Sequence, residues 1–363
     1  MPRLPAAPVG GTRRVVTGVE VSYKRSPFCL VHWEGRDVYA RNCNDRRIFR
    51  LGERSLDILR LASEWTPVPE LASALEAQES KVQRAADRLV EMGLVVTDPP
   101  GAGNDGRDGP GAASWDLIDL ALQRKSARGG FDPDSPPVGP PPPALKSTPG
   151  PAIGLERADL DAGLSFQAVL EARRSVRTYA DEPLALGELG RFLYHAARVT
   201  RRPRAPGWGA LTHRPSPSAG SCHPLEIYPV CNAVAGLEPG AYHYDPGEHT
   251  LRLVRPADAW QEEITRHARA STGNACNRDP AVILVVSAVF QRTMWKYQNI
   301  SLALILKDVG ALYQTMYLVA TALGLAPCAL GGWLEEENAR WLGLDPLAES
   351  QVGGFLLGYP DHR

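Results

Sequence analysis

Two stretches rich in proline and glycine divide this 363-residue chain, and they constrain its fold more than any single motif does. The first covers residues 98–113. The second covers residues 129–151 and contains four consecutive prolines at 140–143. Because such sequence buries too little apolar surface to offset the entropy lost on ordering, we expect linker there, partly extended like polyproline. The chain is long enough for a domain on each side of them.

The predicted organisation is an N-terminal domain at residues 1–98, a linker at 99–153 and a second domain at 154–363. Within the linker, residues 115–128 carry apolar side chains at helical spacing, which predicts one helix packed on a domain. The six cysteines are scattered without a Cys-x-x-Cys pair, so we expect reduced thiols and no metal site. No signal peptide and no apolar run that could span a bilayer is evident, which favours the cytoplasm.

The N-terminal domain is predicted to be winged-helix-like, a small α/β unit. Its expected elements are a hairpin at residues 28–33 and 38–41, helices at 55–63, 68–75 and 80–92, and a final strand at 94–97. The helices begin near Ser or Pro, and Gly93 stands where the third helix should stop.

A winged helix can bind DNA, but the expected recognition helix argues against it. Lys81, Arg84 and Arg88 on that helix are accompanied by Asp87 and Glu91, which leaves a thin basic face. The whole chain has a net charge of −1, so we expect no nucleic-acid partner. The first sixty residues carry twelve Lys/Arg and six Asp/Glu, so they could attract an acidic partner or simply expose arginines. Peptide binding or packing on the second domain is favoured.

The second domain is predicted to be α+β, with a sheet covered by long helices. The helical patterns lie at residues 165–174, 185–199, 259–270 and 301–323. The β-rich runs lie at residues 225–231, 251–254, 282–288 and 351–357.

An arginine run follows the first of these helical patterns. It contains Arg173, Arg174, Ser175 and Arg177. Forked guanidinium donors match phosphate oxygens, so the run is suited to holding a phosphate, although most arginine clusters are solvated surface charge.

Three further segments carry polar or small residues that fit a site. In the loop at 216–228, Ser218, Ser221 and His223 could bond the edge of a planar ligand, although such a loop is often an ordinary turn. The pair Lys296-Tyr297 offers two proton-transfer groups whose pKa values burial or a nearby charge could lower. The glycines at 331 and 332 would let the main chain approach a ring system.

In this order, the segments resemble the flavin-dependent nitroreductase superfamily, and more closely its SagB-type (McbC-like) azoline dehydrogenases. The resemblance covers about residues 165–360. It rests on Arg-Arg-Ser-Val-Arg, Pro-Ser-Ala-Gly-x-x-x-Pro-x-Glu, and Lys-Tyr before an apolar helix. Ala-Leu-Ile-Leu-Lys-Asp-Val-Gly and Gly-Leu-Ala-Pro-Cys-Ala-Leu-Gly-Gly are further matches. An N-terminal winged-helix-like module, often related to leader-peptide recognition, is also typical of this branch.

The resemblance implies a nitroreductase-like fold, an FMN cofactor and a role for each matching residue. Lys296 and Tyr297 match the catalytic pair. The phosphate and ribityl chain would be held by Arg173, Arg174, Ser175 and Arg177. The isoalloxazine ring would be bordered by Pro217, Ser218, Ala219, Ser221 and His223, and approached by Gly331 and Gly332.

The implied reaction oxidises a thiazoline or oxazoline in a ribosomally made peptide to the azole, with a proton lost to Lys296 or Tyr297 and a hydride to FMN. A homodimer and a cyclodehydratase partner are implied too. Carrier-bound azolines or small molecules as substrates, and a catalytically silent peptide-binding scaffold, are the alternatives. The N-terminal module favours a peptide. Whether the product is a thiazole or an oxazole stays open.

The chain departs from the branch at two places. Where the branch has an aromatic residue in the helix after Lys-Tyr, this chain has Leu302. Where the branch has a basic residue soon after the last strand, Gly358 is followed by Tyr-Pro-Asp-His, and Arg363 is the last residue of the sequence.

Overall fold

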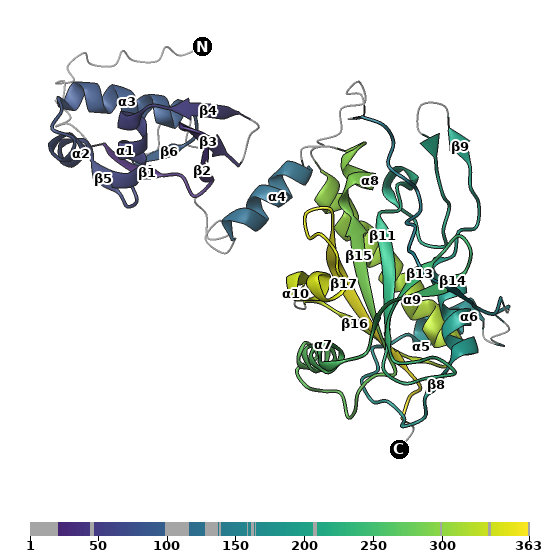
Figure 1. Ribbon diagram of the computed structural model, residues 1–363. Coiled ribbons are helices and arrows are strands. Elements are labelled where there is room, and N and C mark those ends of the chain that lie inside the picture. Colours follow the sequence, from purple (N-terminus) through teal and green to yellow (C-terminus); the bar gives the residue numbers. More distant parts are fainter. Residues whose placement is uncertain are drawn as a thin grey trace, which may run out of the picture. The chain divides into compact units, whose positions relative to one another are not determined.

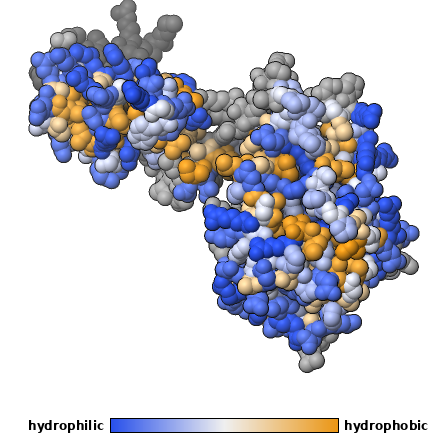
Figure 2. Space-filling model, viewed as in Figure 1, coloured by the Kyte–Doolittle hydropathy of each residue, from blue (hydrophilic) through white to orange (hydrophobic). Residues whose placement is uncertain are grey.

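The computed structural model describes most of the chain, in two compact units, Met1–Arg128 and Gly129–Arg363, each with its own hydrophobic core (Figure 1). Blue, hydrophilic residues cover most of the visible surface of both units, with orange apolar patches among them (Figure 2). The described residues are 21–43, 47–98, 116–127, 137, 139–157, 159–160, 163, 165–205, 209–297, 300–332 and 335–361.

The smaller unit combines two three-stranded sheets, ordered β5-β1-β6 and β2-β3-β4, with helices α1, α2 and α3. The predicted hairpin is confirmed: Glu34 pairs with Asp37 across a turn in which Gly35 has a φ of +61°. The strands are β1 Ser22–Arg25, β2 Cys29–Glu34, β3 Asp37–Asn42, β4 Ile48–Leu51, β5 Thr66–Pro67 and β6 Val95–Asp98. The helices are α1 Glu53–Leu61, α2 Val68–Ala74 and α3 Glu79–Glu91.

Helix α3 shows why the helical predictions for this unit hold. Val82, Ala86 and Leu89 recur at helical spacing and are all buried in the core of the unit. The helix ends before Gly93, whose φ of +70° is favourable for glycine. All three predicted helices are present within two residues of their expected bounds, and the winged-helix assignment itself stays a prediction.

Helix α4, Leu117–Ala127, also belongs to the smaller unit, although its sequence lies within the predicted linker. Its Leu120 packs against Phe28 and Cys43. The carboxylate of Asp116 caps the helix by accepting hydrogen bonds from the backbone N–H groups of residues 118 and 119, at 2.9 and 3.2 Å.

The larger unit is built on a seven-stranded antiparallel sheet, ordered β16-β17-β15-β11-β13-β14-β7. Its strands are β7 Ala152–Gly154, β11 Leu225–Cys231, β13 Gly240–Asp245, β14 Thr250–Pro256, β15 Val282–Val289, β16 Ala326–Leu330 and β17 Glu349–Gly358. Short pairs are formed by β8 Leu184–Ala185 with β12 Val234–Ala235, and by β9 Arg204–Ala205 with β10 Gly209–Ala210. A 3₁₀ turn covers Ala219–Ser221.

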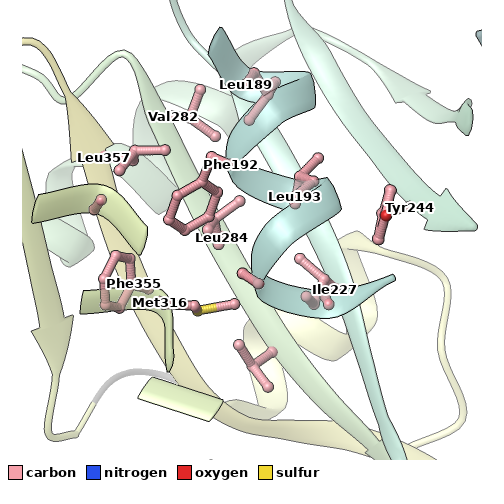
Figure 3. Packing of buried hydrophobic residues seen from close by; sticks show 14 of the residues in the cluster. Leu189, Phe192, Leu193, Ile227, Tyr244, Val282, Leu284, Met316, Phe355 and Leu357 are labelled. Carbon is pink, nitrogen blue, oxygen red and sulfur yellow. The ribbon is translucent and has the colours of Figure 1, made fainter. Parts of the chain in front are cut away.

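Helices cover both faces of this sheet, because its central strands are apolar on both sides. Leu284 of β15 points into one core, and its neighbours Ile283 and Val285 point into the other. The first core includes residues of α6 and α9, with Phe192 and Met316 close to Phe355 of β17 in Figure 3. The second core includes residues of α7. The helices are α5 Phe166–Ala172, α6 Leu186–Ala197, α7 Ala259–Ala270, α8 Phe290–Met294, α9 Ser301–Ala322 and α10 Glu335–Trp341.

The structure corrects the predicted linker at its C-terminal part. Residues 152–154 form β7, which pairs with β14, and Lys146 forms an ion pair with Glu349 of β17. Residues 139–153 therefore belong to the larger unit. The proline-rich composition hid this in part because three backbone carbonyls of the segment, a group that even proline retains, accept hydrogen bonds from side chains of the larger unit.

Helix α9 is the one helix among the described residues that is long and apolar enough, by length and composition, to cross a membrane. Lys307 and Asp308 interrupt its apolar run, as the sequence analysis expected. A core helix of a soluble protein meets the same criterion. Here Ile305, Leu312 and Met316 of α9 are buried in the first core, so its packing accounts for its apolar character.

Candidate functional site

Helix α9 connects the sequence segments that were predicted to form a site. Three of its polar side chains, Asp308, Tyr313 and Tyr317, each hydrogen-bond to a different one of these segments. Asp308 and Tyr317 are nine residues apart, which corresponds to ~13 Å along a helix. The predicted phosphate-binding and catalytic segments therefore lie at different levels of the same helix.

Asp308 holds the loop that precedes β11. Its carboxylate accepts a hydrogen bond from Ser218 Oγ at 2.5 Å and another from the Ala219 N–H at 3.2 Å. Ser218 Oγ in turn accepts the N–H of His223 at 3.0 Å. Burial raises the pKa of Asp308, and these hydrogen bonds from the loop act against that rise. The carboxylate therefore fixes the path of a loop made of small residues.

Lys296 and Tyr297 meet this loop at Gly220. A Cβ atom added to Gly220 would lie 2.4 Å from Tyr297 Oη and 2.7 Å from Lys296 Nζ. Gly220 has a φ of +57°, a conformation that suits glycine. Lys296 Nζ lies 5.3 Å from the centroid of the Tyr297 ring. The polar ends of both side chains thus converge on a backbone that has no side chain of its own.

The environment of Tyr297 corrects one expectation. The sequence analysis expected burial or a neighbouring charge to lower the pKa values of the pair, but for Tyr297 burial raises the pKa, with Cys222 and Asp308 adding to the rise. An uncharged phenol loses less on burial than a phenolate does. Tyr297 therefore keeps its proton at neutral pH.

The arginine run lies beside Tyr317. Helix α5 ends before Arg173, and from there the chain passes along β16, where the Val176 N–H donates to Pro327 O at 2.8 Å. Ser175 Oγ shares a hydrogen bond of 2.7 Å with Tyr317 Oη, and the Arg173 guanidinium lies 5.3 Å from the Tyr317 ring centroid. Arg173 is half-buried, whereas Arg174 and Arg177 are exposed, so these donors remain accessible to an anion.

The backbone at Gly331 and Gly332, directly after β16, is accessible to a ligand. Tyr313 Oη donates to Leu330 O at 3.3 Å and accepts the Gly354 N–H at 2.6 Å, which holds the end of β16 against β17. A Cβ atom at Gly331 or Gly332 would meet no atom within 4 Å. A planar ligand could therefore lie against this backbone.

Not every predicted residue lies on the open side of the loop. Pro217 is exposed and Ser221 half-buried, but only 6 % of His223 is exposed. Burial lowers the pKa of His223 to about 3, and the charges of Arg214, His213 and Arg292 contribute. His223 is therefore a neutral side chain beneath the loop, and its role at a ring edge stays a prediction.

We expect the His223→Gln variant to be less sensitive to acid than the wild type. The imidazole pKa is about 3 in the folded state and near 6.5 when exposed, so below pH 6.5 the unfolded chain binds a proton that the folded protein does not. His223 should then contribute a fall of ~1 kcal/mol per pH unit to the free energy of unfolding of the wild type between pH 6 and 4, and the variant should lack this contribution. Urea unfolding across this range measures it.

The control for this experiment is His267→Gln on α7, where the histidine is half-buried in another part of the unit. This variant also replaces a histidine by glutamine but keeps the imidazole beneath the loop, so it measures the effect of the substitution itself. Equal slopes for wild type and His223→Gln would contradict the assignment of a neutral, buried imidazole.

The structure thus brings all four predicted segments to α9 or to the loop that α9 holds. Sequence reasoning missed Asp308, Tyr313 and Tyr317. Asp308 stands in one of the quoted motifs, where it and Lys307 are the charged residues in an apolar stretch, which was the available signal. Arg363 lies outside the described residues.

Comparison with known proteins places this fold in a family. The Nitroreductase family matches residues 170–359, more than half of the chain. The chain belongs to the nitroreductase family. It is therefore an oxidoreductase of a flavin-binding family. A putative nitroreductase of Methanocaldococcus jannaschii, MJ1384, is 32 % identical over 189 residues, which are 52 % of this chain and 88 % of that protein.

Within the nitroreductase family, the chain is also similar to two peptide-processing proteins. It is 26 % identical over 176 residues to the trifolitoxin-processing protein TfxB of Rhizobium leguminosarum bv. trifolii, covering 48 % of this chain and 47 % of TfxB. It is 26 % identical over 137 residues to the microcin B17-processing protein McbC of Escherichia coli, covering 36 % and 49 %. The chain thus spans about half the length of each. The chain is a McbC-like member of the family.

A solved structure supports the fold. The crystal structure of a putative nitroreductase from Anabaena variabilis superimposes with a TM-score of 0.50 at 23 % identity, over 65 % of this chain and 45 % of that chain. The α+β prediction for the second domain is confirmed.

The residues of the site fit a flavin mononucleotide in three respects. The exposed and half-buried arginines beside Tyr317 are suited to a phosphate, because guanidinium groups bind phosphate oxygens in pairs. The open backbone at Gly331 and Gly332 leaves space for a flat ring. Gly220 provides a second stretch of backbone without a side chain, and it lies close to the two proton-transfer groups, Lys296 and Tyr297.

Proposed function

We propose that this protein oxidises a thiazoline or oxazoline ring in a ribosomally made peptide to the thiazole or oxazole, with FMN as its cofactor. The observation that carries the proposal is the convergence of Lys296 and Tyr297 on Gly220, in a loop fixed by Asp308. The peptide-processing roles in the names of TfxB and McbC support the choice of a modified peptide as substrate.

Two groups of residues beside α9 would hold the cofactor, one next to Tyr317 and one next to Tyr313. Arg173, Arg174, Ser175 and Arg177 would bind its phosphate and ribityl chain, and the backbone at Gly331 and Gly332 would face its ring. When bound, FMN would accept the hydride that the azoline ring loses.

The side chains of the protein would handle the proton. Lys296 in its uncharged form would take a proton from a ring carbon. Together with the hydride that FMN would accept, the azoline ring would lose two hydrogens. Tyr297 keeps its own proton because burial raises its pKa, so it would donate a hydrogen bond that orients the substrate or Lys296. Asp308 would keep the loop at the distance that both groups require.

The smaller unit would contribute substrate recognition. A winged-helix-like module that binds the leader part of a peptide would explain why the oxidoreductase unit is preceded by a second folded unit. We further propose a homodimer, a cyclodehydratase partner that forms the azoline, and a cytoplasmic location. A nucleic-acid partner is not proposed.

The test begins with the visible absorbance spectrum of the purified protein and mass identification of any released chromophore. Stoichiometric FMN, followed by loss of two hydrogens per ring from an azoline-containing peptide, is the expected result. A protein that binds no added FMN, or that binds FMN and leaves azolines unchanged, would overturn the proposal.

We expect the Arg173→Gln variant to bind FMN at least about tenfold more weakly, because a charge-assisted hydrogen bond to a phosphate is worth about 1.5–3 kcal/mol. Flavin fluorescence titration measures the affinity. Arg204→Gln removes an exposed arginine of β9 and is the control, with unchanged affinity expected. Equal affinities for the two variants would remove Arg173 from the phosphate site.

A further inference from the structure

Residues 139–148, which we name the strap, precede the first strand of the seven-stranded sheet in the sequence. The strap contacts the turn that carries Lys296 and Tyr297. Its Pro143 carbonyl accepts a hydrogen bond from Arg292 Nε at 2.9 Å, and its Gly139 carbonyl accepts one from Trp295 Nε1 at 2.9 Å. Arg292 lies within α8 and Trp295 caps it, immediately before the Lys-Tyr pair.

Arg292 is a buried cation that joins three parts of the unit. Only 4 % of it is exposed. Besides the strap, its Nη1 donates to His223 O at 3.2 Å and to Glu226 Oε1 of β11 at 2.5 Å. Glu226 is also buried, and burial of such a pair offsets much of the attraction between its charges. The pair is therefore a weak source of stability and a strong constraint on geometry.

The hydrogen bonds form a circuit that returns to the strap. Glu226 Oε2 bonds to His243 Nε2 at 2.8 Å, and His243 Nδ1 bonds to Thr148 Oγ at 2.7 Å. Elsewhere in the strap, Lys146 donates to Tyr228 Oη at 2.6 Å and pairs with Glu349. The side chains of Lys146 and Thr148 thus tie the strap to three strands of the sheet, β11, β13 and β17, and its backbone carbonyls tie it to α8.

Helix α8 cannot define its own orientation. It has five residues, and a helix this short is not stable without tertiary contacts. The backbone N–H groups of Lys296 and Tyr297 both bond to Thr293 O, at 3.1 and 2.8 Å, so the pair follows α8 as one turn. The contacts that orient α8 therefore also orient Lys296 and Tyr297.

We propose that the strap positions Lys296 and Tyr297 against the loop at Gly220, and that Arg292 and Trp295 are the positioning residues through which it acts. The inference deepens the proposed function, since it concerns the residues that hold its two proton-transfer groups. It extends the site to a segment that precedes the family-matched residues 170–359.

Cys222 offers a direct measure of this positioning. It follows Gly220 in the loop and is the one half-buried cysteine, the other five being buried. Lys296 lies near enough to act on the pKa of its thiol, which burial raises to about 11. Its rate of alkylation, read by mass spectrometry of the labelled peptide, reports how often the Lys-Tyr turn leaves the loop, with or without a bound cofactor.

The test is the Trp295→Phe variant of the full chain, which removes the indole N–H and keeps an aromatic ring. We expect Cys222 alkylation about fivefold faster, the factor that corresponds to the ~1 kcal/mol net worth of one hydrogen bond. The Arg292→Lys variant should also accelerate it, because an ammonium cannot bond to all three acceptors in the geometry of a guanidinium.

Trp260→Phe is the matched control. Trp260 of α7 is also buried and also donates its indole N–H to a backbone carbonyl, Pro256 O, at 2.9 Å. A loss of stability alone would act similarly in both variants, whereas the proposal requires Cys222 alkylation to stay unchanged in Trp260→Phe. Unchanged alkylation in Trp295→Phe, or an equal rise in Trp260→Phe, would overturn the proposal.

Turnover separates this inference from the proposed function. If the wild type oxidises azolines, Trp295→Phe should lower kcat and leave the KM for the peptide and the FMN content near their wild-type values. If the wild type has no such activity, the proposed function fails, and the alkylation rates still decide whether the strap positions the Lys-Tyr turn.

Discussion

Replacing Lys296 by alanine should lower the kcat of azoline oxidation by about 10²–10⁴-fold while FMN content stays unchanged. A positioned acid–base group contributes a factor of this size, and Lys296 Nζ is one of the two polar atoms that converge on Gly220. The measurement is the initial rate of azole formation by mass spectrometry, with the flavin content checked by absorbance.

Lys307→Ala provides the control for this prediction. Lys307 is an exposed lysine of α9, adjacent to Asp308 in sequence, and its loss should leave kcat near the wild-type value. Wild-type turnover in Lys296→Ala with full flavin content would exclude this lysine from the mechanism. A colourless Lys296→Ala variant would show that the residue serves the cofactor instead.

Gly220→Ala should have an effect of comparable size without removing any proton-transfer group. The new methyl group would lie 2.4 Å from Tyr297 Oη and 2.7 Å from Lys296 Nζ, so both side chains would have to move. A displacement of about 1 Å at a reacting centre can lower a rate about 10²-fold. We therefore expect kcat to fall by about that factor, measured by the same assay.

Gly236→Ala separates this effect from backbone strain. Gly236 has a φ of +82°, so alanine is strained there as well, but a Cβ atom at this position would meet no atom within 4 Å. Its kcat should stay near the wild-type value. If both glycine variants lose the same activity, strain and not the displacement of the Lys-Tyr turn is responsible.

The strands that sequence predicted best are the ones buried on both faces. β11 has the predicted bounds and β15 is one residue longer, because each is an apolar run with a single polar residue in it, Glu226 in β11 and Ser287 in β15. β13 was not predicted, because its six residues include His243 and Asp245, which do not suggest a buried strand. His243 is nevertheless fully buried, since Glu226 and Thr148 satisfy both of its ring nitrogens.

The motifs identified the segments of the candidate site but not what holds them together. Ser218 and Lys296 stand in recognisable patterns, whereas Tyr313 and Tyr317 occupy positions on an apolar helix where aromatic residues usually form core. Their hydroxyl groups become informative only when the fold places them beside β16. Sequence spacing alone cannot supply such contacts, since the Tyr317 hydroxyl also bonds to Ser175, which lies far from it in the sequence.

The pairing of β7 with β14 has a consequence for shortening the protein. A chain that begins at residue 165, close to the start of the family match, would lack both β7 and the strap. Strand β14 would then present unpaired N–H and C=O groups along a free edge, which is a template for association between molecules. Lys146 would no longer neutralise the buried Glu349. Such a protein should aggregate, so the smallest well-behaved fragment of the larger unit has to include residue 139.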